Sequence, residues 1–419
     1  MVRSVTAVDI DPLDLVLPER YGLGSFPHDA WTRLRAEDPV HWCEPEGYRP
    51  FWAITKHADI KAVSSNPERF SSVPRLALQP VAYEEKMLEV FPEAADQGGQ
   101  PLRMLVTMDP PDHRAYRNLA GPYFRPRVLK NLEDRVAEVT TLLLDRHAGT
   151  DVELDFVTEV ASLHPLRMIC EILGVARDDE RVILQLTNEL FAAEDPEFAR
   201  EDKLAIIPDL FDFFFRLVEE KRATPGEDLA SVLANGEIDG EPLPHIELLS
   251  YFVLVATAGH DTTRNALSGG MQALLEHPDQ LDALRADPSL ARTAADEFVR
   301  WASPVVHFIR TATEDTELGG KQIKAGDHLC LYYPSANRDE DVFEDPFAFR
   351  IDRDPNPHLA FGVGEHFCLG ASLARMELRT FLEQFATRIE RLAPAGDPAR
   401  THASFVGGYK HLPIRWTLT

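Results

Sequence analysis

One cysteine of the chain stands in a setting suited to metal binding. Cys368 follows a glycine-rich stretch, Phe361-Gly-Val-Gly-Glu-His-Phe, and precedes an apolar stripe that predicts a helix. The glycines allow positive φ and the close approach of a flat ligand. The unpaired N–H groups of a helix start favour the thiolate, the form that binds a metal. A lone cysteine is usually a small buried apolar residue, but the glycines, the helix start and the nearby His366 argue against that interpretation.

A long apolar stretch contains an acid next to an alcohol. Residues 248–277 have the pattern of one helix, which Ala258-Gly-His-Asp-Thr-Thr263 interrupts. Glycine and paired threonines are disfavoured inside helices, and a threonine hydroxyl can bond to a carbonyl one turn earlier, so we expect a local distortion and a polar notch. Asp261 beside Thr262 could relay protons to a bound ligand. In isolation, a structural role for both residues is the simpler interpretation.

Two basic side chains share one face of a further predicted helix. Pro110-Pro111 is suited to a helix start, and His113 and Arg117 follow at a spacing of four residues. On spacing alone a solvated charged face is the better interpretation, and an anionic ligand is the alternative. The neighbourhood is basic within an acidic chain, so it could dock an acidic partner through Arg114, Arg125, Arg127 and Lys130.

These segments occur in the order found in the cytochrome P-450 superfamily, which the chain resembles from about residue 20 to its end. The loop Phe361-Gly-x-Gly-x-His-x-Cys-x-Gly370 is similar to the heme-binding loop of that family, and Glu297-Phe-Val-Arg300 to its Glu-x-x-Arg motif. Arg353 matches the arginine that completes the buried Glu-x-x-Arg network. A looser similarity, in 256–263, 333–339 and 405–408, is to the bacterial α-terpineol hydroxylases.

The resemblance implies roles for individual residues. Cys368 is expected to be the axial ligand of the iron of heme b, with Thr262 positioning dioxygen and Asp261 feeding protons. The expected contacts of the heme propionates are His113, Arg117, Arg310 and His366. The expected walls of the substrate pocket are Ala258, Val305, Val306, Phe405 and Val406, together with a lid formed by residues 71–105.

Composition limits the classes of function and compartment. The 419 residues include 69 acids and 43 bases, a net charge of −26 that argues against general nucleic-acid binding. Four scattered cysteines without a CxxC pair indicate neither a disulfide framework nor a zinc site and fit a reducing cytoplasm. We find no signal peptide and no apolar run of about 18–20 residues, so we expect a cytoplasmic protein without a membrane anchor.

The expected fold is mainly α with a smaller β-rich part, as one cytochrome P-450 domain over residues 1–419. The heme would lie between the long central helix and the cysteine loop. We expect an irregular N-terminal arm over about residues 1–20, strands at Val40–Trp42 and Phe51–Ile54, and short strands within 305–333. Residues 225–244 are expected to form a turn-rich connection, and 401–419 a terminal hairpin. The phenylalanines of 204–218 are either core or pocket roof.

The predicted function is that of a heme-thiolate monooxygenase that hydroxylates a C–H bond of a small apolar substrate, a terpenoid or alkyl-aromatic compound, with O2. The chain has no GxGxxG fingerprint and no cysteine cluster, so its two electrons would come from a ferredoxin with a ferredoxin reductase. Alternatives are the same chemistry on a steroid or fatty-acid-like lipid, a peroxygenase-type enzyme, or a non-catalytic heme protein. The pair of Asp261 and Thr262 argues against the last two.

Overall fold

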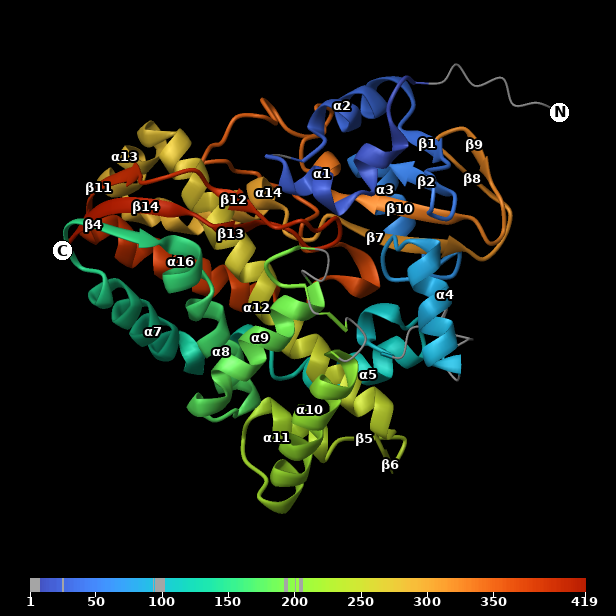
Figure 1. Cartoon of the computed structure of the whole chain (residues 1–419), viewed down its shortest axis with the longest axis horizontal. Helices are drawn as coiled ribbons and strands as arrows, with labels where there is room; N and C mark the ends of the chain where they lie inside the picture. The colour runs from blue at the N-terminus through green and yellow to red at the C-terminus, as the bar shows by residue number, and fades with distance from the viewer. Residues whose placement is uncertain are drawn as a thin grey trace.

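The longest helix of the computed structural model, α12 (His245–Glu276), runs through the middle of the molecule (Figure 1). It packs against α8, α9, α10, α14 and α16. The structure describes residues 8–24, 26–92, 94, 102–191, 195–199, 201–202 and 206–419. The other helices of this part are α1 (Pro18–Gly22), α2 (His28–Glu37), α3 (His57–Ser64), α4 (Val81–Val90), α5 (Asp112–Ala120), α6 (Pro126–Leu129), α7 (Glu133–Arg146), α8 (Leu163–Leu173), α9 (Glu180–Phe191), α10 (Ile206–Ala223), α11 (Leu229–Ala234), α13 (Pro278–Ala286), α14 (Ala291–Ala302), α15 (Tyr333–Ala336) and α16 (Ala371–Arg388).

The strands form small sheets, of which the two larger ones lie on opposite sides of the view in Figure 1. They are β1 (Val40–Cys43), β2 (Phe51–Ile54), β3 (Phe70–Ser71), β4 (Gly149–Asp155), β5 (Glu237–Ile238), β6 (Glu241–Pro242), β7 (His307–Ala312), β8 (Thr316–Leu318), β9 (Lys321–Ile323), β10 (His328–Tyr332), β11 (Ile389–Pro394), β12 (Ala399–Arg400), β13 (Tyr409–His411) and β14 (Pro413–Leu418). The largest sheet has the order β1-β2-β10-β7-β3, and a second has the order β11-β14-β4. The prediction of a mainly α fold with a smaller β-rich part is confirmed.

The predicted hairpin near the N-terminus is also confirmed. Strands β1 and β2 pair antiparallel, with Val40 opposite Ile54, and β10 adds parallel to β2. Further along the chain, Gly319 and Gly320 form the turn between β8 and β9 with φ of 56° and 73°, values that favour glycine. Strand β7 belongs to the same sheet as β1 and β2. It begins two residues after Val305, and this end of the sheet adjoins the candidate active site.

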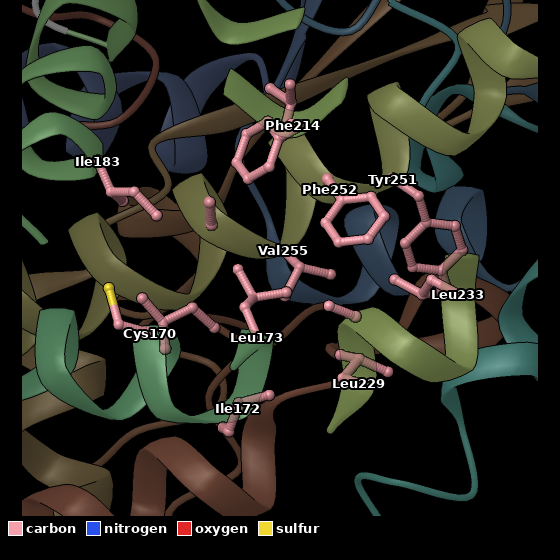
Figure 2. Packing of buried hydrophobic residues seen from close by; sticks show 14 of the residues in the cluster. Cys170, Ile172, Leu173, Ile183, Phe214, Leu229, Leu233, Tyr251, Phe252 and Val255 are labelled. Atoms are coloured by element: carbon pink, nitrogen blue, oxygen red, sulfur yellow. The ribbon is translucent and has the colours of Figure 1, made fainter. Parts of the chain in front are cut away.

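The helical core explains why several apolar segments fold as they do. Side chains from α8, α9, α10, α11 and α12 interdigitate in one cluster, of which Figure 2 shows a part. Phe214 of α10 packs on Phe252 of α12, with ring centroids 5.6 Å apart. Phe213 is buried beside it, whereas Phe215 is exposed. Of the two interpretations of this aromatic segment, the structure therefore supports core packing for Phe213 and Phe214.

Three segments that were expected to be irregular contain helices. Residues 225–244 contain α11 and the β5–β6 pair rather than turns alone, because Asp228 caps α11 by accepting a bond from Ser231 N–H at 2.7 Å. The segment 71–105 contains α4, which starts directly after Pro80. The N-terminal arm includes α1 and a 3-10 turn at Pro12–Leu15, and Leu15 is fully buried. Residues 93 and 95–101 of the expected lid, and 1–7 of the arm, lie outside the described residues.

The last strands do not form the predicted terminal hairpin. Strand β13 pairs with β12, whereas β14 lies between β11 and β4. The reason is the apolar face of β14, because Ile414, Trp416 and Leu418 are buried in the same cluster as α14 and α16. Burial of that face against β4 and the helices outweighs local pairing with the preceding strand.

Candidate active site

A large cavity lies between α12 and the segment that contains Cys368. The empty space in it, including the solvent-open part at its mouth, is about 1550 Å³. Three of the regions that form its walls are far apart in sequence: the middle of α12, the cysteine loop with the start of α16, and the residues before and within β7. Further lining residues come from α5, α8 and the segment around Leu105. The lining residues from these regions include Leu254, Val255, Ala258, Thr262, Val305, Phe308, Arg310, Phe361, His366 and Cys368.

The cysteine loop is shaped by its glycines. Gly362 and Gly364 have φ of 69° and 77°. A Cβ on Gly364 would stand 2.6 Å from the backbone oxygen of Ser64, so a larger residue would clash with α3 as well as strain the backbone. The N–H of Cys368 donates to the carbonyl of Phe361 at 2.8 Å and closes the loop. The loop thus presents the cysteine at the cavity surface just before α16.

The environment of the Cys368 thiol combines two opposing effects. Burial raises the pKa of the thiol, while the backbone N–H of Gly370, the charges of Arg117 and Arg375 and the backbone N–H of Ala371 lower it, and the net shift is upward. The helix start alone therefore does not produce the thiolate that the sequence pattern suggested, because burial outweighs it. A metal ion bound at the sulfur would deprotonate it outright. The side chain is only partly covered by protein, since it lines the cavity.

Basic side chains line one wall of the cavity. Arg310 is 5% exposed, and in the part of the chain that the structure describes it has no ion-pair partner. Burial lowers the pKa of its guanidinium, the sign of a cation that lacks compensation. Arg117 donates to the carbonyl of Phe367 at 2.7 Å and also lines the cavity. A buried cation without a partner calls for an anionic ligand.

Two histidines complete this wall. The rings of His113 and His366 lie 4.2 Å apart between centroids. Both ring nitrogens of His113 are buried without a hydrogen-bond partner among the described residues, whereas Nε2 of His366 lies 3.0 Å from the hydroxyl of Ser72. Burial, with the charge of Arg310 next in importance, lowers the pKa of His366 to about 2. His366 is therefore a neutral hydrogen-bonding group at physiological pH.

On the α12 side, Thr262 lines the cavity and Asp261 does not. The hydroxyl of Thr262 donates to the carbonyl of Ala258 at 2.7 Å, the bond expected from the sequence, while the helix continues unbroken from His245 to Glu276. Asp261 is fully buried and does not line the cavity. Its Oδ1 lies 2.9 Å from Arg264 Nη2 and 3.6 Å from His260 Nδ1. Burial raises the pKa of this carboxyl, but Arg264 and His260 outweigh it and the net shift is downward.

The expected pocket walls divide into two layers. Ala258 and Val305 line the cavity, but Val306, Phe405 and Val406 do not. These three stand behind the wall: Val306 N–H donates to the carbonyl of Phe405 at 2.8 Å, and Val406 pairs with Val305 in a short β-bridge. The ring of Phe405 packs on Phe308, a lining residue, at 5.6 Å. The turn containing Phe405 therefore supports the pocket wall instead of forming it.

Several lining residues were missed by the sequence reasoning. Leu254 and Val255 lie one turn before Ala258 on the same helix face, so the helical period could have identified them. Val106 was missed as well, whereas Leu105 lines the cavity as the last residue of the expected 71–105 lid; α4 of that lid does not line it. His260 and Arg264 are the partners of Asp261. In the sequence, nothing distinguished these two residues from ordinary helix residues.

The scaffold around Glu297 matches its predicted role. Arg300 Nη2 and Nε each lie 2.7 Å from a different oxygen of Glu297, and Arg353 Nε lies 3.3 Å away. All three residues are buried. Asn356 donates to the same carboxylate at 3.1 Å, which ties α14 to the chain that leads into the cysteine loop.

Comparisons with known proteins identify the family. The cytochrome P-450 family model matches residues 92–403. The chain belongs to the cytochrome P-450 family. Cytochrome P-450-terp of a Pseudomonas species is 37% identical to it, with 96% of each chain covered. A steroid C26-monooxygenase of Mycolicibacterium smegmatis is 37% identical (98% of this chain, 94% of that protein), and a linalool 8-monooxygenase of Pseudomonas putida is 36% identical (96% and 98%).

Solved structures agree with this assignment. The crystal structure of CYP108D1 from Novosphingobium aromaticivorans superposes with a TM-score of 0.88 at 34% identity, and covers 97% of this chain and 98% of its own. The protein is thus a cytochrome P-450 monooxygenase, and heme b is the cofactor of its family. Among the described residues, no helix combines the length and the apolar character needed to span a membrane.

The cavity of this cytochrome P-450 fits heme b by its own chemistry. A thiol stands at one face of the cavity, and one edge holds the buried guanidinium of Arg310 and the ring nitrogens of His113, none of which has an ion-pair or hydrogen-bonding side-chain partner within the described part of the chain. These groups are suited to bind a metal and the carboxylates of a flat dianion. The residues that could hold the cofactor are His113, Arg117, Arg310, His366 and Cys368.

Proposed function

We propose that this cytochrome P-450 hydroxylates a C–H bond of a small apolar substrate, a terpenoid or an alkyl-aromatic compound, with electrons from a ferredoxin and its reductase. The observation that carries the substrate class is the α12 side of the cavity. Apart from Tyr251, Thr262 and Thr263, the α12 residues that line it are apolar or glycine. Such a wall favours a ligand that offers hydrocarbon surface and few polar groups.

In this proposal Cys368 supplies the thiolate that holds the iron of heme b, and the thiolate-bound heme supplies the oxygen-activating chemistry. Arg117 and Arg310 bind the propionates as cations, and His366 and His113 add hydrogen bonds. With the propionates bound to them, these basic residues are not available to bind a substrate carboxylate. A fatty acid would find no further cation on the α12 side of the cavity, which makes free fatty acids the weaker substrate class.

Thr262 is placed to act on a ligand at the cavity surface. Its hydroxyl hydrogen points at the carbonyl of Ala258, so its oxygen is left to accept a hydrogen bond from a ligand in the cavity. To donate to that ligand, the hydroxyl must first leave Ala258. The proposed role of Asp261 is to supply the proton that follows, and the ion pair with Arg264 keeps the carboxyl ionised until then.

A second substrate class has some support. A steroid C26-monooxygenase is as similar to this chain as cytochrome P-450-terp, each being 37% identical. A steroid is also apolar and would meet the same cavity wall. Experiments therefore have to compare the two classes directly.

The decisive experiment is a spectral titration of the heme-loaded protein with terpenoids, alkyl-benzenes, fatty acids and steroids, followed by the ferrous–CO spectrum of the same sample. We expect a long-wavelength CO band and a high-spin shift with terpenoids or alkyl-benzenes. A shift with steroids alone would transfer the proposal to the second class. An imidazole-like CO band in folded protein would refute Cys368 as the ligand.

A further inference from the structure

A proton that reaches Asp261 has to come through one of its neighbours. The carboxyl is fully buried and does not line the cavity. Among the described residues, the groups that face it at ion-pair distance are Arg264 and His260. The inference that follows concerns His260 and rests on the proposed function, in which Asp261 delivers protons to the cavity.

Arg264 cannot carry a proton to the carboxyl. An arginine in a protein keeps its proton over the whole physiological range. Its guanidinium is also fixed from the other side, because Nη1 donates to Asn188 Oδ1 of α9 at 2.7 Å. Arg264 therefore holds Asp261 in its ionised form without exchanging protons with it. Histidine, in contrast, gains and loses a proton near neutral pH.

The orientation of His260 directs its exchangeable proton at Asp261. Nε2 lies 3.1 Å from the carbonyl oxygen of Ser162, which can only accept, so Nε2 keeps its hydrogen in both charge states. The proton that comes and goes is therefore on Nδ1. This atom lies 3.6 Å from Asp261 Oδ1 and 3.4 Å from the hydroxyl of Thr187. A neutral ring would turn a lone pair toward the carboxylate, whereas the protonated ring turns an N–H toward it.

Among the described residues, the ion pairs and hydrogen bonds of Asp261 and His260 reach no charged side chain other than Arg264. Helix α9 contributes the neutral side chains of Thr187 and Asn188, and the segment before α8 contributes the carbonyl of Ser162. Arg264, on α12 itself, is the fixed charge that contacts the pair in the described structure. Thr187, the α9 neighbour of His260, is fully buried, whereas Asn188, which contacts Arg264, is only partly so, and we take α9 as the side from which water approaches.

We propose that His260 is a positioning residue that reprotonates Asp261. The N–H bond at Nδ1 of the imidazolium breaks, and an O–H bond forms at Asp261 Oδ1 after a small rotation of the two side chains. The neutral imidazole then takes a proton from solvent water on the α9 side. No electrons are transferred in this step. The route runs from α9 through His260 and Asp261 to Thr262 at the cavity.

The kinetic test uses His260→Gln in the heme-loaded protein with a surrogate ferredoxin system and linalool as the probe substrate. Glutamine can still donate to the carbonyl of Ser162 but cannot exchange a proton. We expect product formation to slow by about 10²-fold and the solvent isotope effect to increase. The double variant with Asp261→Asn should lose no more than Asp261→Asn alone. A wild-type rate in His260→Gln would overturn the proposal. So would a double variant whose loss in rate equals the product of the losses in the two single variants.

His164 offers a matched control. It is a second buried histidine that faces a carboxylate, with Nδ1 3.2 Å from Glu377 Oε2, and it does not contact Asp261. His164→Gln should therefore leave the solvent isotope effect unchanged even where it lowers stability. An equal change in both histidine variants would show a general packing effect and would overturn the relay.

An independent readout avoids turnover. In the diamagnetic ferrous–CO form labelled with ¹⁵N-histidine, His260 should keep its Nε2 proton at high pH and gain the Nδ1 proton as the pH falls. Asp261→Asn removes the facing carboxylate and should lower the pH at which that proton is gained. An unchanged titration would mean that the two groups do not share a proton. If the ¹⁵N spectrum shows that His260 and Asp261 are coupled, but no terpenoid, alkyl-benzene, fatty acid or steroid is oxygenated, the proposed function is wrong and the inference about His260 stands.

Discussion

Arg310 is the residue whose environment makes the clearest demand for a ligand, because its buried charge has no ion-pair partner in the described structure. We predict that Arg310→Met releases heme about 10- to 100-fold faster, since a charged hydrogen bond contributes roughly 1.5–3 kcal/mol. Transfer of heme to an excess of apomyoglobin measures this rate. Arg310→Lys, which keeps the charge, should recover part of the loss.

A second buried arginine provides the comparison. Arg338 is 3% exposed and donates to the carbonyls of Arg300 and Trp301, but it does not line the cavity. Arg338→Met should lower the denaturation midpoint and leave heme release from the folded protein unchanged. If both variants release heme at the same increased rate, general destabilisation accounts for the effect and Arg310 has no specific role at the cofactor edge.

Among individual residues, those fixed by local contacts could be predicted from the sequence, and those fixed by distant contacts could not. The cysteine loop could be identified because its determinants are local: two glycines with positive φ and a bond between Cys368 and Phe361 within one short segment. The position of the Asp261 carboxyl could not. It is set in part by His260, whose ring is fixed by Ser162 and Thr187, 98 and 73 residues away along the chain. Such contacts arise only from packing of α12 against α8 and α9.

For helices and strands, the periodicity of apolar residues predicted where an element lies in the sequence better than it predicted which other element packs against it. The long helix α12 and the β1–β2 hairpin follow from the apolar pattern. Helix α4 was hidden because Pro80 looked like a breaker, although proline is compatible with a helix start. The alternating residues of β14 indicated a strand, but its pairing with β4 depends on a segment more than 250 residues earlier.

The link between α14 and the loop before α16 leads to a prediction about these elements. Glu297 alone compensates Arg300 and Arg353 within the described ion pairs, and all three are buried. Glu297→Gln keeps the shape and removes the charge. We expect the free energy of unfolding to fall by about 3–5 kcal/mol, because two buried guanidinium groups lose their counter-ion. Urea unfolding, followed separately by heme absorbance and by tryptophan fluorescence, measures this.

The control lies on the same helix. Arg292 forms an exposed pair with Asp354, with nitrogen and oxygen 3.7 Å apart. Arg292→Gln should leave the unfolding midpoint unchanged, since exposed pairs contribute little. A similar small loss in both variants would show that the Glu297 network is dispensable. In that case the cysteine loop would be held in place by its own backbone bonds alone.

The charge distribution of the whole molecule supports the proposed docking of a redox partner. The chain carries a net charge of −26, yet Arg125, Arg127 and Lys130 are exposed together around α6. Val128 of α6 is an exposed apolar residue of this patch, and α6 packs on α16, the helix that follows the cysteine loop. Arg114 contributes less than expected, since it is paired with Glu365. An acidic iron–sulfur protein would be attracted to this basic patch in an otherwise acidic protein.

We therefore predict that the double variant Arg125→Glu and Arg127→Glu is reduced more slowly by a ferredoxin at low salt, and that its rate depends less on ionic strength. Stopped-flow formation of the ferrous–CO complex measures both. The matched double variant Arg391→Glu and Arg415→Glu makes the same change in net charge on exposed residues of β11 and β14, away from the cysteine loop. Because long-range repulsion acts on both variants and local docking on one only, equal slowing in the two would contradict a docking site at α6.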